Sequence, residues 1–97
     1  MVRHVVLFRW IDGATDEQLQ AVVDGLAELR AAIAEIADYR YGPDLGVDDG
    51  TADFAVVADF ATVADYETYR DHPAHRDFIA RCIAPIRRER MAVQLEI

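Results

Sequence analysis

Residues 2–11 alternate in a way that fits a β-strand with two partly apolar faces. Successive side chains of a strand point to opposite sides of the sheet, so every second residue shares a face. One face holds a histidine among large apolar residues: Val2, His4, Val6, Phe8 and Trp10. The other face holds Arg3, Val5, Leu7, Arg9 and Ile11. A sheet built on this strand therefore presents apolar side chains in both directions.

A long amphipathic helix is predicted after this strand. Thr15 opens it, and Gln18 follows at the spacing of a capping box. Apolar residues then recur at helical intervals and form one stripe: Leu19, Val22, Val23, Leu26, Leu29, Ile33 and Ile36. The helix is therefore expected to pack one face against the sheet.

Three further strands are predicted, at 38–45, 54–60 and 90–97. The segment 46–53 between the first two is rich in glycine and aspartate. It lacks the spacing of acidic residues and the terminal glutamate that calcium loops use, so we interpret it as a solvated hairpin connection.

A second helical region is predicted between residues 62 and 86, and Pro73 interrupts it. Thr62 can cap its first part, which carries Tyr66 and Tyr69 on one side. Pro85 marks the end of its second part. The apolar residues of that part are Phe78, Ile79, Cys82, Ile83 and Ile86.

The predicted order is strand, helix, strand, strand, helix, strand over a single domain, residues 1–97. This is the βαββαβ arrangement of α+β, ferredoxin-like folds with a four-stranded antiparallel sheet. We expect the most apolar alternate set to face the helices: His4, Val6, Phe8, Phe54, Val56, Ala58, Phe60, Met91, Val93 and Leu95. The opposite face is expected to carry Val5, Leu7, Ala55 and Val57 beside Arg3, Arg9, Asp59 and Glu96. It is too apolar to leave in water, and a second copy of the chain is the simplest cover.

The segment 69–75 contains the side chains best suited to catalysis, one tyrosine and two histidines. Pro73 ends the first helix near His72 and can begin the next one. His75 then lies in a first helical turn, where the helix dipole favours the neutral imidazole that a general base needs. Two alternatives stay open: His72 caps the helix while His75 lies on the surface, or the two histidines supply half of a zinc site.

Composition excludes several classes of function. With 18 acidic and 10 basic side chains, the net charge of −8 argues against binding to nucleic acid or anionic membranes. No segment approaches the roughly 20 apolar residues that span a bilayer, and the N-terminus does not resemble a secretory signal. A single cysteine, Cys82, allows no internal disulfide. We therefore expect a cytoplasmic protein that needs no metal.

Four segments together resemble one known family. Residues 2–8, 15–19 and 69–75, with the closing strand, resemble the stress-responsive dimeric α/β-barrel (Dabb) domain over essentially the whole chain. The resemblance implies a homodimer in which two four-stranded sheets close into a barrel through the face not covered by helices. It also implies a small apolar or aromatic ligand.

The family includes plant polyketide cyclases that catalyse an aldol condensation without metal or organic cofactor. Laid on their pattern, His75 matches the catalytic base, Tyr69 the tyrosine that works with it, and His4 and His72 two further pocket histidines. The remaining positions match substrate-binding pocket residues: Val6, Phe8, Val22, Val23, Leu26, Leu29, Val56 and Phe78. Two departures leave the substrate open, because Leu26 replaces a pocket tyrosine and Arg70 replaces an isoleucine.

The resemblance favours a cofactor-independent cyclase, of aldol or other proton-transfer type, acting on a small polyketide-like or aromatic carbonyl compound. Two alternatives remain. One is a non-catalytic, stress-responsive homodimer that binds a small apolar ligand, and the other is a cofactor-free monooxygenase.

Overall fold

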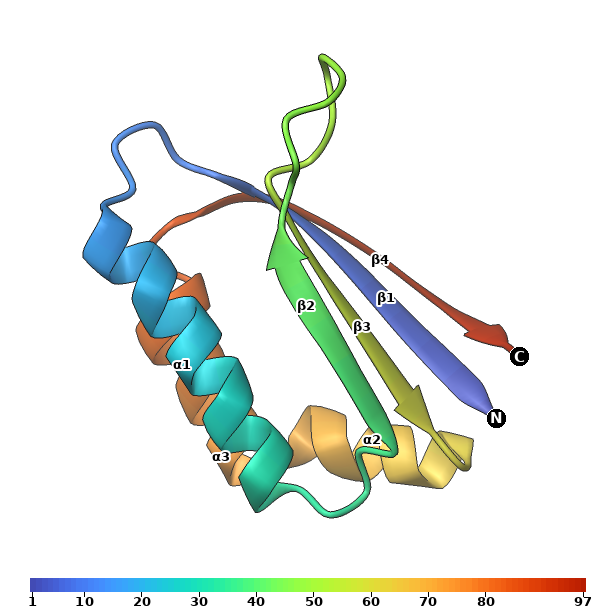
Figure 1. Ribbon diagram of the computed structural model, residues 1–97. Helices are drawn as coiled ribbons and strands as arrows, with labels where there is room; N and C mark the ends of the chain where they lie inside the picture. The colour runs from blue at the N-terminus through green and yellow to red at the C-terminus, as the bar shows by residue number, and fades with distance from the viewer.

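The computed structural model describes residues 1–97 and contains one antiparallel sheet with all helices on one side (Figure 1). Its strands are β1 (Val2–Trp10), β2 (Asp38–Pro43), β3 (Phe54–Phe60) and β4 (Arg87–Glu96). They lie in the order β2-β3-β1-β4, and every neighbouring pair is antiparallel. The predicted α+β, ferredoxin-like arrangement is confirmed.

The helices follow the predicted positions. They are α1 (Asp16–Ala32), α2 (Val63–Asp71), α3 (Pro73–Phe78) and the π-helical turn η1 (Ile79–Ile83). Thr15 and Gln18 form the predicted capping box at the start of α1. None of the helices is long and apolar enough to cross a membrane.

Several predicted boundaries were wrong by a few residues. The helix α1 ends at Ala32, because Ile33 has an extended backbone, although Ile33 and Ile36 stay buried in the core. The strand β2 ends at Pro43, which has no N–H to donate to a ladder, and not at residue 45. The last strand begins at Arg87, not at residue 90, because Arg87 still pairs with β1.

The predicted orientation of β4 was also wrong. In the observed register Phe8 lies opposite Arg90, Val6 opposite Ala92 and His4 opposite Gln94. Directly paired residues share a face, so the helix side of β4 carries Arg90, Ala92, Gln94 and Glu96. Met91, Val93 and Leu95 lie on the uncovered side and are 73%, 56% and 45% exposed. The prediction assigned the more apolar set to the core, whereas β4 is an edge strand with its apolar set turned outward.

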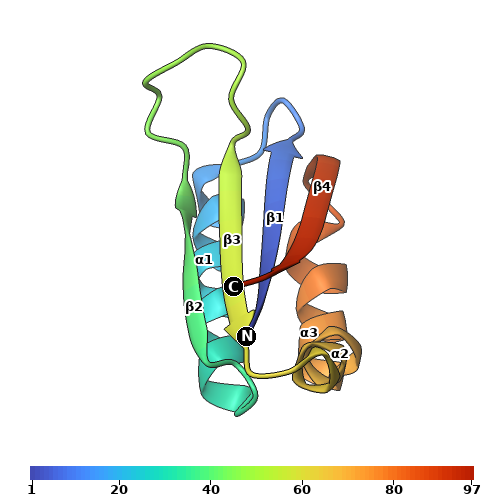
Figure 2. The ribbon, with the colours of Figure 1, turned by 90° about the vertical axis from the view of Figure 1, so that its right-hand side faces the viewer.

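The core lies between the sheet and the helices. Its fully buried members come from the sheet and from the helical layer: Val22, Leu26, Ile33, Ala58, Phe60, Ile83 and Ile86. Gly25 allows α1 to approach α3 closely, since a Cβ at this position would lie 2.4 Å from the ring of Phe78. Figure 2 looks onto the opposite, uncovered face of the sheet, where no helix packs.

Candidate active site

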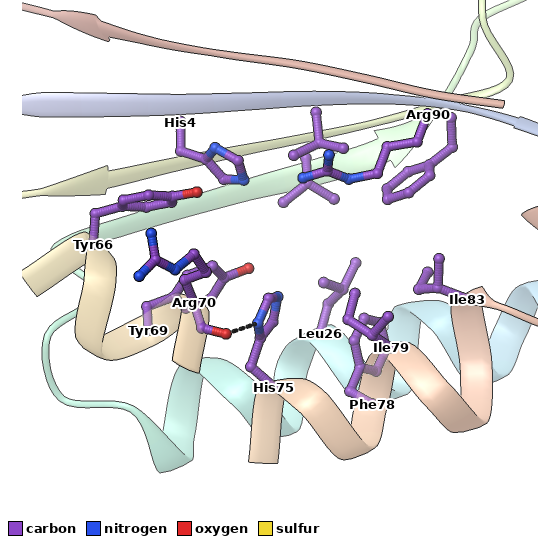
Figure 3. Close-up of a pocket in the computed structure, with 13 residues that line it drawn as sticks. His4, Leu26, Tyr66, Tyr69, Arg70, His75, Phe78, Ile79, Ile83 and Arg90 are labelled. Carbon is purple, nitrogen blue, oxygen red and sulfur yellow. Dashed lines mark hydrogen bonds between the residues drawn. The ribbon is translucent and has the colours of Figure 1, made fainter. Parts of the chain in front are cut away.

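A cavity of about 60 Å³ lies between the helix side of the sheet and the helices α1, α2 and α3 (Figure 3). Most of its walls are apolar, and its polar groups come from β1, α2, α3 and β4. The lining residues are His4, Val6, Phe8, Leu26, Val56, Tyr66, Tyr69, Arg70, His75, Phe78, Ile79, Ile83 and Arg90. An apolar cavity with a few converging polar groups is the usual form of a ligand site.

The proline between α2 and α3 positions the two downstream histidines differently. Pro73 is the first residue of α3, and His72 has the extended backbone of a helix cap. The Nδ1 atom of His72 accepts a hydrogen bond from the Ala74 N–H at 3.0 Å. His72 is therefore the capping residue, and His75, in the first turn of α3, is the histidine that lines the cavity.

His75 is held as a neutral base. Its Nδ1 lies 3.1 Å from the backbone carbonyl oxygen of Arg70, which can only accept, so Nδ1 carries the proton and donates. The lone pair of the imidazole is then on Nε2. Burial lowers the pKa of His75, although the bond to Arg70 opposes this. The ring also packs on Tyr69, with centroids 4.2 Å apart.

His4 is a neutral imidazole of the opposite tautomer. The Nε2 amide of Gln94 donates to His4 Nδ1 at 2.8 Å, which leaves the His4 proton on Nε2. Burial, followed by the charges of Arg90 and His75, lowers the pKa of His4 to about 4. The ring of Tyr66 lies beside it, with centroids 4.9 Å apart. The cavity thus holds one imidazole that accepts at Nε2 and one that donates.

Tyr69 brings a protonated phenol to the cavity wall. Its hydroxyl lies 2.7 Å from that of Tyr39, a buried residue of β2 that does not line the cavity. Either hydroxyl can donate in this hydrogen bond, and when Tyr39 donates, the Tyr69 O–H is free to donate to a ligand. Burial raises the pKa of Tyr69 to about 12 and raises the pKa of Tyr39 further. Both phenols therefore stay protonated at neutral pH.

The structure brings together most of the residues expected at the site. His4, Val6, Phe8, Leu26, Val56, Tyr69, His75 and Phe78 all line the cavity. Val22, Val23, Leu29 and His72 do not. Val22 and Leu29 are instead buried in the core, because the cavity meets α1 only near Leu26.

Arg70 also lines the cavity, at the position where the resemblance expected a substituted pocket residue. Sequence reasoning missed four lining residues: Tyr66, Ile79, Ile83 and Arg90. Arg90 was missed because β4 was given the wrong face. The supporting residues Tyr39 and Gln94 lie 30 and 90 positions from their partners, and no local pattern signals contacts of that range.

The titratable side chains do not gather into a metal site. No group of three or more histidine, cysteine, aspartate or glutamate side chains is placed to hold a metal ion. Cys82 is buried with a free thiol and does not line the cavity.

The sequence matches the family model of the Dabb, or stress responsive A/B barrel, domain over residues 2–97. The chain belongs to the Dabb family. No curated protein sequence matches this chain. The family membership agrees with the predicted resemblance and with the ferredoxin-like topology.

Three solved structures illustrate the range of this fold. A dimeric ferredoxin-like protein of unknown function from Thermobifida fusca is 45% identical, with a TM-score of 0.91 over 99% of this chain and 90% of that one. A hydroxynitrile lyase from Passiflora edulis is 23% identical (TM-score 0.86, 99% and 92% coverage). An antibiotic biosynthesis monooxygenase is 12% identical (TM-score 0.81, 100% and 98% coverage). At these identities the last two share the fold alone, and the chemistry of this Dabb chain depends on the residues of its own cavity.

Proposed function

We propose that the cavity is the active site of a cofactor-independent enzyme that moves a proton at a carbon next to a carbonyl group. His75 is the general base, and Tyr69 is the hydrogen-bond donor to the carbonyl oxygen. The observation that carries this proposal is the fixed tautomer of His75. Its Nδ1–H is bound to the Arg70 carbonyl, so its basic Nε2 is free beside an apolar cavity.

The proton-transfer step needs a base and a site for the developing negative charge. Nε2 of His75 takes the proton, and the electron pair of the broken C–H bond moves onto the carbonyl oxygen as an enolate forms. The Tyr69 O–H and the Nε2–H of His4 are two neutral donors for that oxygen. Both groups are neutral at neutral pH: the raised pKa of Tyr69 keeps the proton on its hydroxyl, and the lowered pKa of His4 leaves that ring uncharged with its single proton on Nε2.

Cavity size restricts the part of the substrate that reacts. A volume of about 60 Å³ is well below the roughly 300–1,000 Å³ of sites for drug-sized ligands. It holds a small carbonyl head group, and any longer chain must extend through the mouth. We therefore favour small carbonyl compounds, and an aldol-type cyclisation only where the reacting carbonyl alone enters the cavity.

The experiment compares His75→Ala and Tyr69→Phe with the wild type. The substrates are linear poly-β-ketones and aromatic carbonyl compounds, followed for cyclised product and for exchange of the α-hydrogen in D₂O. Loss of the base reduces turnover by roughly a hundredfold or more. Tyr69→Phe costs less, because it removes one hydroxyl and keeps the ring. Arg76→Ala, next to His75 but outside the cavity, is the matched control.

Full activity in His75→Ala would overturn the catalytic role of this residue. Equal ligand affinity in both proteins with turnover in neither would support the alternative of a ligand-binding protein. Oxygen uptake with an oxygenated product would support the monooxygenase alternative.

The pH dependence of activity follows from the state of His75. Only the neutral imidazole accepts a proton, and its pKa is lowered from the ordinary value of 6.5. The acid limb of the profile for kcat/KM is therefore expected to have its midpoint below pH 6.5. An acid limb centred above 6.5 would contradict the assignment.

We also propose that the protein is a homodimer through the uncovered sheet face. This face carries exposed Leu7, Met91, Val93 and Leu95 on adjoining strands. The Thermobifida fusca relative, 45% identical, is described as dimeric. A contiguous apolar face of this kind on a small protein is typical of a protein–protein interface.

A further inference from the structure

Arg90 differs from almost all other cations of the protein in having no partner. The chain contains ten arginines and no lysine. Eight of the arginines lie within 4.0 Å of a carboxylate, and the two that do not are Arg87 and Arg90. Of these two, only Arg90 lines the cavity.

The guanidinium of Arg90 is directed into the site. Arg90 lies on the helix side of β4, opposite Phe8, and its side chain extends along the cavity toward His4 (Figure 3). Its positive charge contributes to the lowered pKa values of both His4 and His75, so it acts on both imidazoles.

Arg70, the other arginine of the cavity, is already neutralised. It binds both carboxylate oxygens of Asp71, at 3.0 and 2.9 Å, and lies 3.8 Å from Glu67. Arg90 is exposed, and it is the one charged lining residue of the cavity that has no ionic partner. A ligand that brings a negative charge would complete it.

We propose that Arg90 binds a carboxylate of the substrate, so that the enzyme acts on small oxo acids and not on neutral carbonyl compounds. This deepens the proposed function and rests on it for the identity of the reacting group. A guanidinium binds a carboxylate through two parallel hydrogen bonds, which would also orient the carbonyl next to it. We expect a monoanion and not a phosphate or another polyanion. Only one arginine of the cavity lacks an ionic partner, the cavity is small, and the protein carries a net charge of −8.

The test compares the binding of acetoacetate with that of its neutral isostere acetoacetamide, by NMR titration of the wild type and two variants. We expect the wild type to bind acetoacetate at least tenfold more tightly than the amide. Arg90→Gln removes that preference by weakening acetoacetate alone. Arg87→Gln, which removes the other unpaired arginine of β4 outside the cavity, retains the preference.

The inference is overturned if Arg90→Gln keeps the preference, or if the wild type binds acetoacetate no better than the amide. These outcomes are separable from the fate of the proposed function, because binding needs no turnover. If Arg90→Gln loses the preference while His75→Ala keeps full activity, the carboxylate site is supported and the role of His75 as the catalytic base is refuted. If His75→Ala is inactive while Arg90→Gln keeps the preference, the reverse holds.

Discussion

The two faces of the sheet are both apolar, yet they differ in the state of their polar groups. On the helix side, His4 is buried, and Arg90 has no carboxylate within 4.0 Å. On the uncovered side, Arg3 and Asp59 bind each other through two hydrogen bonds of 2.8 and 2.9 Å. On the helix side, polar groups therefore face a cavity, whereas on the uncovered side Arg3 and Asp59 already neutralise each other. This difference matches the two roles proposed above, catalysis on the helix side and dimerisation on the uncovered side.

The largest loss of folding stability is expected when a charged side chain is introduced on the helix side of the sheet. Ala58 of β3 is fully buried, is not a lining residue of the cavity and pairs with His4 and Tyr39, so Ala58→Glu places a carboxylate in the core with no cationic side chain opposite it. Burial of an unpaired charge costs several kcal/mol, which is comparable to the whole stability of a small domain. The variant should show no cooperative unfolding transition by circular dichroism. A folded variant with wild-type stability would show that this face is not the core.

The same kind of change on the uncovered side is expected to leave the fold intact. Leu7→Glu, at an exposed position of β1, should dissociate the proposed dimer and keep the secondary structure. The interface loses an apolar side chain from each copy, at about 1.5–3 kcal/mol apiece, so the dissociation constant rises roughly a hundredfold or more.

Sedimentation velocity across micromolar concentrations measures this effect. Ala27→Glu is the matched control, because Ala27 is an exposed residue of α1, which packs on the other side of the sheet (Figure 1). A wild type that is already monomeric and folded, or a Leu7→Glu variant as dimeric as the control, would show that the uncovered face is not a dimer interface.

A smaller effect is expected where α1 meets α3. Gly25→Ala puts a Cβ within 2.4 Å of the Phe78 ring, which lines the cavity and must shift. Overpacking costs about 1–3 kcal/mol, and the better helix propensity of alanine returns up to about 1 kcal/mol. Urea unfolding should show a net loss of about 1–2 kcal/mol.

The control for this variant is Gly42→Ala in β2, where an added Cβ meets no atom within 4 Å. We expect no loss of stability there. If both variants have the same urea midpoint of unfolding as the wild type, the close approach of α1 and α3 does not constrain the cavity.

Much of the fold followed from local patterns. The alternation in β1, the capping box at Thr15 and the helix break at Pro73 each depend on neighbouring residues, and the structure has all three. The helix side of β4 was predicted wrongly because apolarity alone was used to choose it. An edge strand facing a partner can be more apolar on the side away from its own helices, and one chain does not reveal this.

The candidate site was predictable only where a local rule applied. Placing His75 in a first helical turn required nothing beyond Pro73. The hydrogen-bond partners of the other site residues could not be predicted from a local rule. The contacts of Tyr39 with Tyr69 and of Gln94 with His4 depend on strand order and register, which sequence periodicity does not determine.

The cavity holds two neutral imidazoles of opposite tautomer, with the basic nitrogen on His75. Long-range ¹H–¹⁵N spectra of the histidine rings, recorded from pH 8 to pH 3.5, test it most directly. We predict that neutral His75 is protonated at Nδ1 with a pKa below 6.5, and that neutral His4 is protonated at Nε2 with a pKa of about 4. A His75 ring protonated at Nε2 in its neutral form, or a His4 that titrates near 6.5, would contradict the account.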